Sequence, residues 1–235
     1  MCKEISVIQV VGSNHADIGT KNEDVTLVEE KDNFLFLGLA DGRSGCKYGK
    51  EGGEISLKEL LNFVNDNDIC QSTNGNEDEK REEIMTSIRR KLENVASFCN
   101  TNICEFSSTI VALVIDKVTG MFVVYHLGDG CILGVINEKI EFISTPSNGI
   151  TNKHTWTTTS KTATEHLNIT SGNIRDYSVV YLMSDGCDCF HQGMYIPFRG
   201  GNLLVNAEKE QLEKYVQQSE VEDDATIIVA KIRQL

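Results

Sequence analysis

The amino-acid sequence predicts an α+β fold, a four-layer αββα sandwich in which two antiparallel β-sheets pack together and helices cover their outer faces. Three observations support this prediction. Short runs of β-branched and aromatic residues recur along the chain, and such runs favour strands. Several neighbouring runs are joined by turns of hairpin length, which favour antiparallel pairing. Helical segments stand between blocks of strands, a pattern more typical of α+β proteins than of repeated βαβ units.

The strand predictions come from apolar, β-branched segments bounded by turn residues. They cover residues 5–11, 25–29, 34–40, 109–115, 122–127, 132–136, 139–143, 178–183 and 226–231. Three short connections, residues 31–33, 116–120 and 137–138, join successive strands. Because a connection this short brings the next strand back beside the previous one, these pairs are expected to be antiparallel hairpins.

Three segments are predicted to be helical because their apolar residues recur every three or four positions. The clearest runs from about residue 79 to 99, a second covers residues 53–64, and a third runs from about 203 to 218. The apolar face of each helix is expected to pack on a sheet. With two prolines and no low-complexity run, the sequence offers no interdomain linker, so residues 1–235 are predicted to form a single domain.

The overall charge argues against several kinds of partner. The chain has 35 acidic and 22 basic side chains, a formal net charge of −13, which repels nucleic acids and anionic membrane surfaces. It contains no apolar stretch of the ~20 residues that a membrane span requires and no signal-peptide pattern at its N-terminus. We therefore expect a cytoplasmic monomer, with no nucleic-acid or membrane partner, whose cysteines are reduced thiols.

Several aspartates lie where a predicted strand begins or ends. Asp41 and Asp185 each follow an apolar run and precede a glycine, Asp24 opens a strand, and Asp129 lies in a Gly-Asp-Gly turn. Asp223 and Asp224 precede the last strand. Any one of them has a simpler explanation as a turn or helix-capping residue. Taken as a set, carboxylates without a histidine or cysteine partner indicate a Mg²⁺ or Mn²⁺ site, because these cations prefer oxygen ligands.

Six short motifs, in this order, resemble those of the type 2C metal-dependent protein phosphatases. The motifs are NED at residues 22–24, LADG at 39–42 with Gly45, ST at 108–109, LGDG at 127–130, MSDG at 183–186 and DDAT at 223–226. Residues 45–48, 51–52 and 164–167 are most similar to a bacterial subgroup of short, stand-alone phosphatase domains. This resemblance implies hydrolysis of phosphoserine and phosphothreonine on proteins, and therefore a phosphoprotein substrate and a cognate kinase as partners.

The resemblance also implies the roles of individual residues. Asp41 would bridge two Mn²⁺ or Mg²⁺ ions, and a water activated between the ions would attack phosphorus in line. The carbonyl of Gly42 and the carboxylate of Asp24 would serve one ion, and Asp185 and Asp223 would complete the other. The remaining implied ligands are Asp129, for a third ion, and Glu23 and Asp224 as second choices. The catalytic set is thus Asp24, Asp41, Asp185 and Asp223. The family also carries a variable flap beside its active site, which corresponds here to residues 144–176.

The sequence departs from the family pattern at three positions. Gly19 occupies the place of a phosphate-binding arginine, Arg43 replaces the histidine of eukaryotic relatives, and Ser107 replaces a glycine. Candidate substitutes for the missing arginine are Lys21, Arg43 and Lys47. Two alternatives stay open, the first because of the missing arginine and Ser107, and the second because each aspartate has an explanation as a turn residue. One is a pseudophosphatase that binds a phosphoprotein or kinase without turnover, and the other is an interaction domain that binds no metal.

Overall fold

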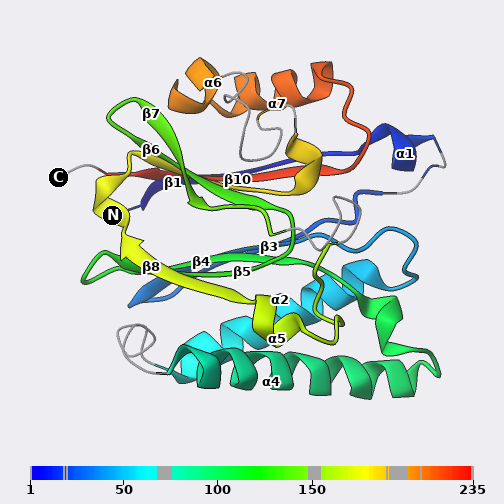
Figure 1. The fold of residues 1–235 in the computed structure, drawn as a ribbon. Helices are drawn as coiled ribbons and strands as arrows, with labels where there is room; N and C mark the ends of the chain where they lie inside the picture. The colour runs from blue at the N-terminus through cyan, green and yellow to red at the C-terminus, as the bar shows by residue number, and fades with distance from the viewer. Residues whose placement is uncertain are drawn as a thin grey trace.

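The computed structural model describes residues 2–17, 19, 21–67, 76–147, 155–188, 190, 201–206 and 208–233. Its layers run helix, sheet, sheet, helix (Figure 1), so the predicted α+β sandwich is confirmed. The predicted loops at residues 66–79 and 144–162 fall partly outside the described residues. None of the described helices combines the length and the apolar character needed to cross a lipid bilayer.

Each sheet has five strands, and every neighbouring pair is antiparallel. The first sheet contains, in spatial order, β1 (Cys2–Val10), β10 (Ala225–Ile232), β9 (Val179–Met183), β6 (Cys131–Ile136) and β7 (Lys139–Ser144). The second contains β2 (Val25–Glu30), β3 (Phe34–Ala40), β4 (Ile110–Asp116), β5 (Met121–Leu127) and β8 (Asn168–Asn173). The predicted hairpins β2–β3, β4–β5 and β6–β7 are all present.

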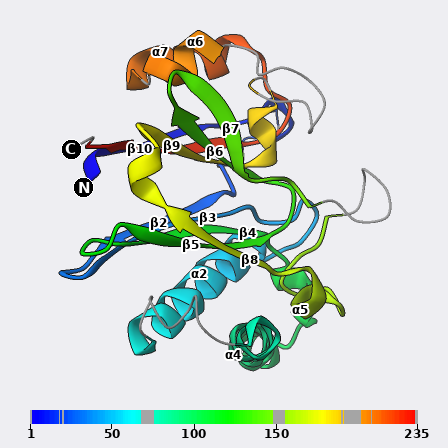
Figure 2. The ribbon, with the colours of Figure 1, turned by 60° about the vertical axis from the view of Figure 1, so that its left-hand side comes forward.

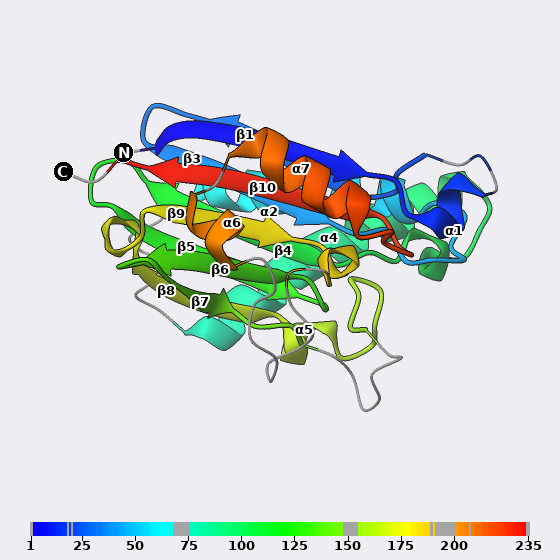
Figure 3. The ribbon, with the colours of Figure 1, turned by 90° about the horizontal axis from the view of Figure 1, so that it is seen from above.

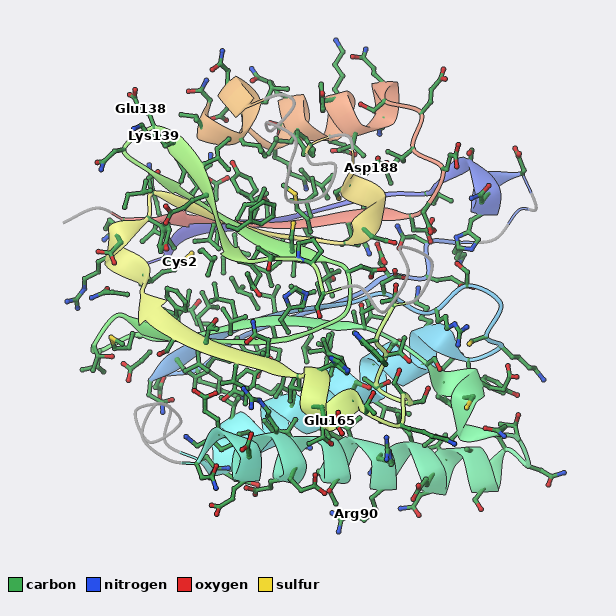
Figure 4. The ribbon with its side chains drawn as sticks, viewed as in Figure 1. Cys2, Arg90, Glu138, Lys139, Glu165 and Asp188 are labelled. Atoms are coloured by element: carbon green, nitrogen blue, oxygen red, sulfur yellow. The ribbon has the colours of Figure 1, made fainter. Side chains whose placement is uncertain are left out.

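The turn geometry explains why the sequence signals for these hairpins were reliable. Asn137 and Glu138 have φ angles of 50° and 62°, and Gly120 has a φ of 79°. Successive left-handed residues give a turn whose twist matches that of the flanking strands. Glu138 and Lys139 mark the tip of the β6–β7 hairpin in Figure 4.

Strand β8 was not predicted, because its sequence NITSGN is polar and contains a glycine. It is an edge strand and pairs only with β5. A Cβ on Gly172 would lie 2.6 Å from Cζ of the Phe122 ring. The glycine therefore makes room for an aromatic side chain of the neighbouring strand. This packing depends on a tertiary contact that a pattern of single residues does not reveal.

Helices cover the outer face of each sheet (Figure 2). Helices α2 (Gly49–Asp66) and α4 (Glu77–Phe98) cover the second sheet, while α6 (Gly201–Asn206) and α7 (Lys209–Gln218) cover the first. Short helical turns complete the fold. They are α1 (Ser13–Ala16), η1 (Ile103–Phe106), α5 (Ala163–His166), η2 (Ile174–Asp176) and η3 (Asp185–Cys187).

Two helix predictions need correction. Helix α2 begins at Gly49, four residues before the predicted start, although glycine disfavours helices. Its glycines permit close packing, since a Cβ on Gly52 would lie 2.0 Å from the Phe106 carbonyl oxygen. The prediction of one helix over 203–218 was wrong, because α6 and α7 are separate helices. Glu208, with φ −82° and ψ 121°, is extended and precedes α7 as its N-cap.

Apolar side chains fill three layers of core. Between the sheets lie Leu37, Leu113, Leu182 and Ile228, among others. A second cluster joins the outer face of the β2–β8 sheet to α2 and α4, and a third joins the other sheet to α6 and α7. Strand β3 is buried along its whole length, which explains its continuous apolar sequence FLFLGLA.

The strand register brings the motif-bearing ends to one end of the sandwich. Met183, at the end of β9, pairs with both Cys131 and Ile227, so the residues just before β6 and β10 lie next to those just after β9. In the other sheet Val25 pairs with Ala40, and residue 41 follows directly. Figures 1 and 3 show α1 and the turn after β9 at this same end.

Candidate metal centre

Three of the predicted aspartates gather at this end of the sandwich. One carboxylate oxygen from each of Asp41, Asp129 and Asp185 lies within 4.8 Å of the corresponding oxygens of the other two. Asp41 follows β3 of one sheet, whereas Asp129 precedes β6 and Asp185 follows β9 of the other. The centre therefore draws its carboxylates from both sheets. We call these three residues the aspartate trio.

Asp41 is held through its backbone by Thr109. The amide of Asp41 donates a hydrogen bond to Thr109 Oγ1 at 2.9 Å, and the amide of Thr109 donates to the Asp41 carbonyl at 2.9 Å. Thr109 also packs against Gly128, where an added Cβ would lie 2.6 Å from Thr109 Cγ2. A single threonine thus positions Asp41 and the turn that carries Asp129. The ST motif signalled this position, but sequence reasoning assigned it no role.

Gly42 lies between the trio and the start of α2. It forms an isolated bridge with Ser108, and a Cβ on it would lie 2.7 Å from the carbonyl carbon of Gly49. Only glycine permits this close approach of two backbones. The role of its carbonyl group as a ligand stays a prediction.

Asp185 is placed by tight packing at the end of β9. A Cβ on the next residue, Gly186, would lie 2.1 Å from the carbonyl oxygen of Asp224. On the other side, a Cβ on Gly130 would lie 2.7 Å from the Met183 carbonyl oxygen. The Oδ1 atom of Asp185 is buried and has no hydrogen-bond partner among the described residues. Gly130 therefore allows the turn carrying Asp129 to approach the end of β9, and Gly186 allows the turn carrying Asp185 to approach the residues just before β10.

Asp24 lies deeper than the trio and does not belong to it. Its side chain is 2% exposed, and its Oδ2 accepts a hydrogen bond from Ser184 Oγ at 3.0 Å. Its Oδ1 has no partner among the described residues. Asn22 shapes this turn, because its Oδ1 accepts from the Asp24 amide at 2.8 Å and its Nδ2 donates to the Val10 carbonyl.

Protein donors already occupy the carboxylate of Asp224. Its Oδ1 accepts from the Gly12 amide at 2.9 Å, and its Oδ2 accepts from the Glu23 amide at 2.6 Å and lies 2.8 Å from His15 Nδ1. It therefore ties the N-terminal turn to the start of β10. Asp223 Oδ1 accepts from the Asp224 amide at 2.9 Å. Glu23 is half-buried, with its Oε2 4.0 Å from His15 Nε2.

The acidic side chains raise one another's pKa values. Burial raises the pKa of Asp24 to about 8, and burial together with Asp129 and Asp223 raises the pKa of Asp185 to about 7. Burial, followed by the charge of Asp24, also raises the pKa of Asp41 well above its usual range. Carboxylates that share a buried site disfavour one another's ionised form. A bound cation would relieve this repulsion.

We expect the stability of the metal-free protein to fall as the pH rises from about 4 to about 8. The folded-state pKa values of Asp24 and Asp185, about 8 and 7, exceed the ordinary value of 3.8, so the folded state binds more protons than the unfolded state in this window. The two protonated carboxyl groups contribute fully to stability below about pH 4. This contribution is lost as the pH rises through their folded-state pKa values. Urea unfolding in EDTA at pH 5 and pH 8 measures the effect, and Asp185→Asn should reduce the pH slope. An unchanged slope in that variant would contradict this origin.

The residues at the centre fit divalent cations. The unpartnered, buried oxygens Asp24 Oδ1 and Asp185 Oδ1 and the clustered oxygens of the trio are hard ligands of the kind that Mg²⁺ and Mn²⁺ prefer. Asp223 adds its charge next to Asp129 and Asp185. The cysteines among the described residues are free thiols, and none of them belongs to the acidic group found there.

The predicted phosphate-binding residues lie on the surface. Lys21, Arg43 and Lys47 are exposed, and Lys47 Nζ lies 5.0 Å from the centroid of the Tyr48 ring. Sequence reasoning overlooked Lys50, which lies in the first turn of α2. It is half-buried, and its Nζ donates to the Asn22 carbonyl at 2.8 Å. The sequence contains no motif that distinguishes this lysine from other surface lysines.

Solved structures similar to this fold include bacterial phosphatases. A structure described as a bacterial serine phosphatase bearing an R161K mutation has a TM-score of 0.74 and 20% identity, covering 98% of each chain. The serine/threonine phosphatase Stp1 from Staphylococcus aureus has a TM-score of 0.73 and 20% identity, covering 99% of this chain and 96% of its own. The catalytic domain of the serine/threonine protein phosphatase PstP, in complex with two manganese ions, has a TM-score of 0.66 and 15% identity, covering 97% of each.

The fold is therefore that of the bacterial serine/threonine phosphatases. No curated protein sequence matches this chain. A family model described as protein phosphatase 2C matches residues 11–230, which include all six motifs. The chain accordingly belongs to the protein phosphatase 2C family, a class of serine/threonine phosphatases.

Proposed function

We propose that this chain hydrolyses phosphoserine and phosphothreonine on proteins with a water molecule activated by divalent cations. The observation that carries the proposal is the aspartate trio, in which oxygens from both sheets lie within 4.8 Å of one another at an end of the sandwich formed by family motifs. Such a cluster is costly without cations, because burial and mutual repulsion disfavour the ionised carboxylates. Bound cations would offset this electrostatic cost, so the cluster is consistent with a cation-binding function.

Each acidic residue has a proposed part. Asp41 would help to hold both of two Mn²⁺ or Mg²⁺ ions, with the Gly42 carbonyl and Asp24 contributing to one ion and Asp185 and Asp223 to the other. Asp129 would contribute to a third ion. Bound there, the ions would supply an activated water and offset charge on the transferring phosphoryl group. The remaining candidates, Glu23 and Asp224, have a less direct part, and for Asp224 the contacts with protein donors favour a structural role.

The protein contributes rigidity to this chemistry. The backbone of Asp41 is fixed on both sides by Thr109, and the turns of Asp129 and Asp185 are packed through glycines that leave no room for a side chain. Ligands held in this way need little reorganisation when charge develops during the reaction. Cationic side chains for the substrate phosphate would come from Lys21, Arg43, Lys47 or the half-buried Lys50.

The finer points of the biology stay predictions. They are the identity of the phosphoprotein, a cognate kinase, a role in signalling, a monomeric state, a cytoplasmic location and the choice between Mn²⁺ and Mg²⁺. The solved relative PstP carries two manganese ions, which supports Mn²⁺ as the first cation to test.

The proposal is tested by hydrolysis of p-nitrophenyl phosphate and of a phosphothreonine peptide with Mn²⁺, with Mg²⁺ and with EDTA. We expect turnover with metal and none with EDTA. Mn²⁺ at about 100 times its dissociation constant should also stabilise the fold by about 2.7 kcal/mol, which thermal unfolding measures. Metal binding without turnover would favour the pseudophosphatase alternative, and the absence of metal binding would favour the interaction domain.

A further inference from the structure

One segment outside the six motifs reaches the aspartate trio. Residues 155–167, which we call the strap, run from the centre to the start of β8 and lie against α4 (Figures 1 and 4). Two arginines of α4 hold its backbone. Arg89 Nη2 donates to the Ser160 carbonyl at 2.8 Å, and Arg81 Nε donates to the Leu167 carbonyl at 2.9 Å. The part of the strap that is distant from the metal centre, residues 160–167, is therefore fixed to α4.

The strap is also fixed within itself. The rings of Trp156 and His166 stack with centroids 3.8 Å apart and an interplanar angle of 9°. The Thr157 amide donates to Ser160 Oγ at 2.9 Å. These contacts make Trp156 an anchor of the segment.

A second set of contacts joins the strap to the loop beside Gly42. The Thr158 amide donates to the Ser108 carbonyl at 2.9 Å. The hydroxyl of Ser107 forms a hydrogen bond with Thr159 Oγ1 and donates to the Cys104 carbonyl at 2.7 Å. Ser107, where the family has glycine, therefore has a partner here that glycine could not hold.

At the end of the strap next to the centre, Thr155 contacts the trio directly. Its hydroxyl donates a hydrogen bond to Oδ2 of Asp129. Asp129 lies in the turn GDG, where Gly128 has a φ of 123°, and the Ser147 amide donates to the Gly128 carbonyl at 2.8 Å. A carboxylate in such a turn can rotate about its side-chain bonds unless a partner fixes it.

We propose that Thr155 is a positioning residue for the metal centre: its hydroxyl, held by the anchored strap, fixes the orientation of the Asp129 carboxylate for cation binding. This inference rests on the proposed function, because it assumes that Asp129 is a metal ligand. Partners that orient a ligating carboxylate commonly affect metal affinity about 10- to 100-fold. The effect should concern the ion that Asp129 serves and leave the other ions bound.

The test is Mn²⁺ titration of the purified full chain by isothermal calorimetry, comparing wild type with Thr155→Val. The variant keeps the size and branching of the side chain and removes the hydroxyl. We expect the affinity of one Mn²⁺ binding step to fall about tenfold. Thr155→Ser, which restores the hydroxyl, should bind Mn²⁺ within about twofold of wild type. Thr170→Val, at an exposed threonine of β8, is the matched control for a threonine-to-valine change and should also match wild type.

The outcomes separate this inference from the proposed function. If wild type binds no Mn²⁺, the proposed function fails. If wild type binds Mn²⁺ and Thr155→Val binds it equally well, the role of Thr155 is wrong while the proposed function stands. Thr155→Ala gives a second variant without the hydroxyl should the valine variant not fold. In the Asp129→Asn background, Thr155→Val should cause no additional loss, and an additional loss would show that Thr155 acts elsewhere.

Discussion

Asp41→Asn is expected to lower kcat/KM for p-nitrophenyl phosphate in the presence of Mn²⁺ by at least about 100-fold. Asp41 is the member of the trio that enters from the β2–β8 sheet, and its neutral replacement would remove the charge shared between ions. A loss of about 3 kcal/mol of charge stabilisation in the transition state corresponds to about two powers of ten in rate. Steady-state kinetics with saturating Mn²⁺ measures the change.

The same substitution should stabilise the metal-free protein. It removes one of several acidic side chains from a site where burial, and after it the charges of the neighbouring carboxylates, raise the pKa of Asp41. Each kcal/mol gained raises Tm by roughly 2–4 °C in a chain of this size. Asp32→Asn, at an exposed acid in the β2–β3 turn, is the control and should change neither property. A variant that keeps wild-type turnover, or one that is less stable than wild type in EDTA, would contradict the assigned role.

Asp224→Ala is expected to destabilise the fold by about 3–5 kcal/mol. The change leaves the Gly12 and Glu23 amides without their acceptor and removes the partner of His15 Nδ1. Buried donors that lose a charged acceptor carry a desolvation penalty of this size. Urea unfolding of wild type and variant, both in EDTA, measures the difference directly.

The controls for Asp224 distinguish structure from metal binding. Glu222→Ala, at an exposed acid two residues away, should leave stability within about 0.5 kcal/mol of wild type. Asp224→Asn keeps one acceptor oxygen and should fall between wild type and alanine. A stable Asp224→Ala protein that has lost Mn²⁺ affinity would mean that Asp224 is a ligand after all.

Much of the fold could be predicted because its strands are apolar and its hairpin turns are short. The runs FLFLGLA and VVYLM are buried throughout, so their ends were marked clearly by the aspartates that follow. Strand β8 and the first turn of α2 could not be predicted, because both depend on glycines that make room for a neighbour. Their stability comes from tertiary packing, which overrides local preference.

The candidate site also contains residues that the sequence predicted and residues that it could not predict. The motifs identified Asp41, Asp129 and Asp185, since each stands at a recognisable strand end. The difference between Asp223 and Asp224 was not visible, because adjacent aspartates in sequence do not reveal which carboxylate accepts from the distant Gly12 and Glu23 amides. The contact between Thr155 and Asp129 joins residues 26 positions apart. It could not be predicted, because no sequence pattern relates residues at that spacing.

The recruitment of the trio from both sheets has a consequence for how the protein would evolve. Asp41 comes from one sheet and its two partners from the other, so we expect the apolar core between the sheets, which contains Leu37 and Leu182, to influence the distance between the carboxylates. Protein interiors are close-packed, so a change of even one methylene group in this core shifts the strands packed against it. Ion selectivity could therefore drift through volume changes deep in the interior while every ligand stays the same.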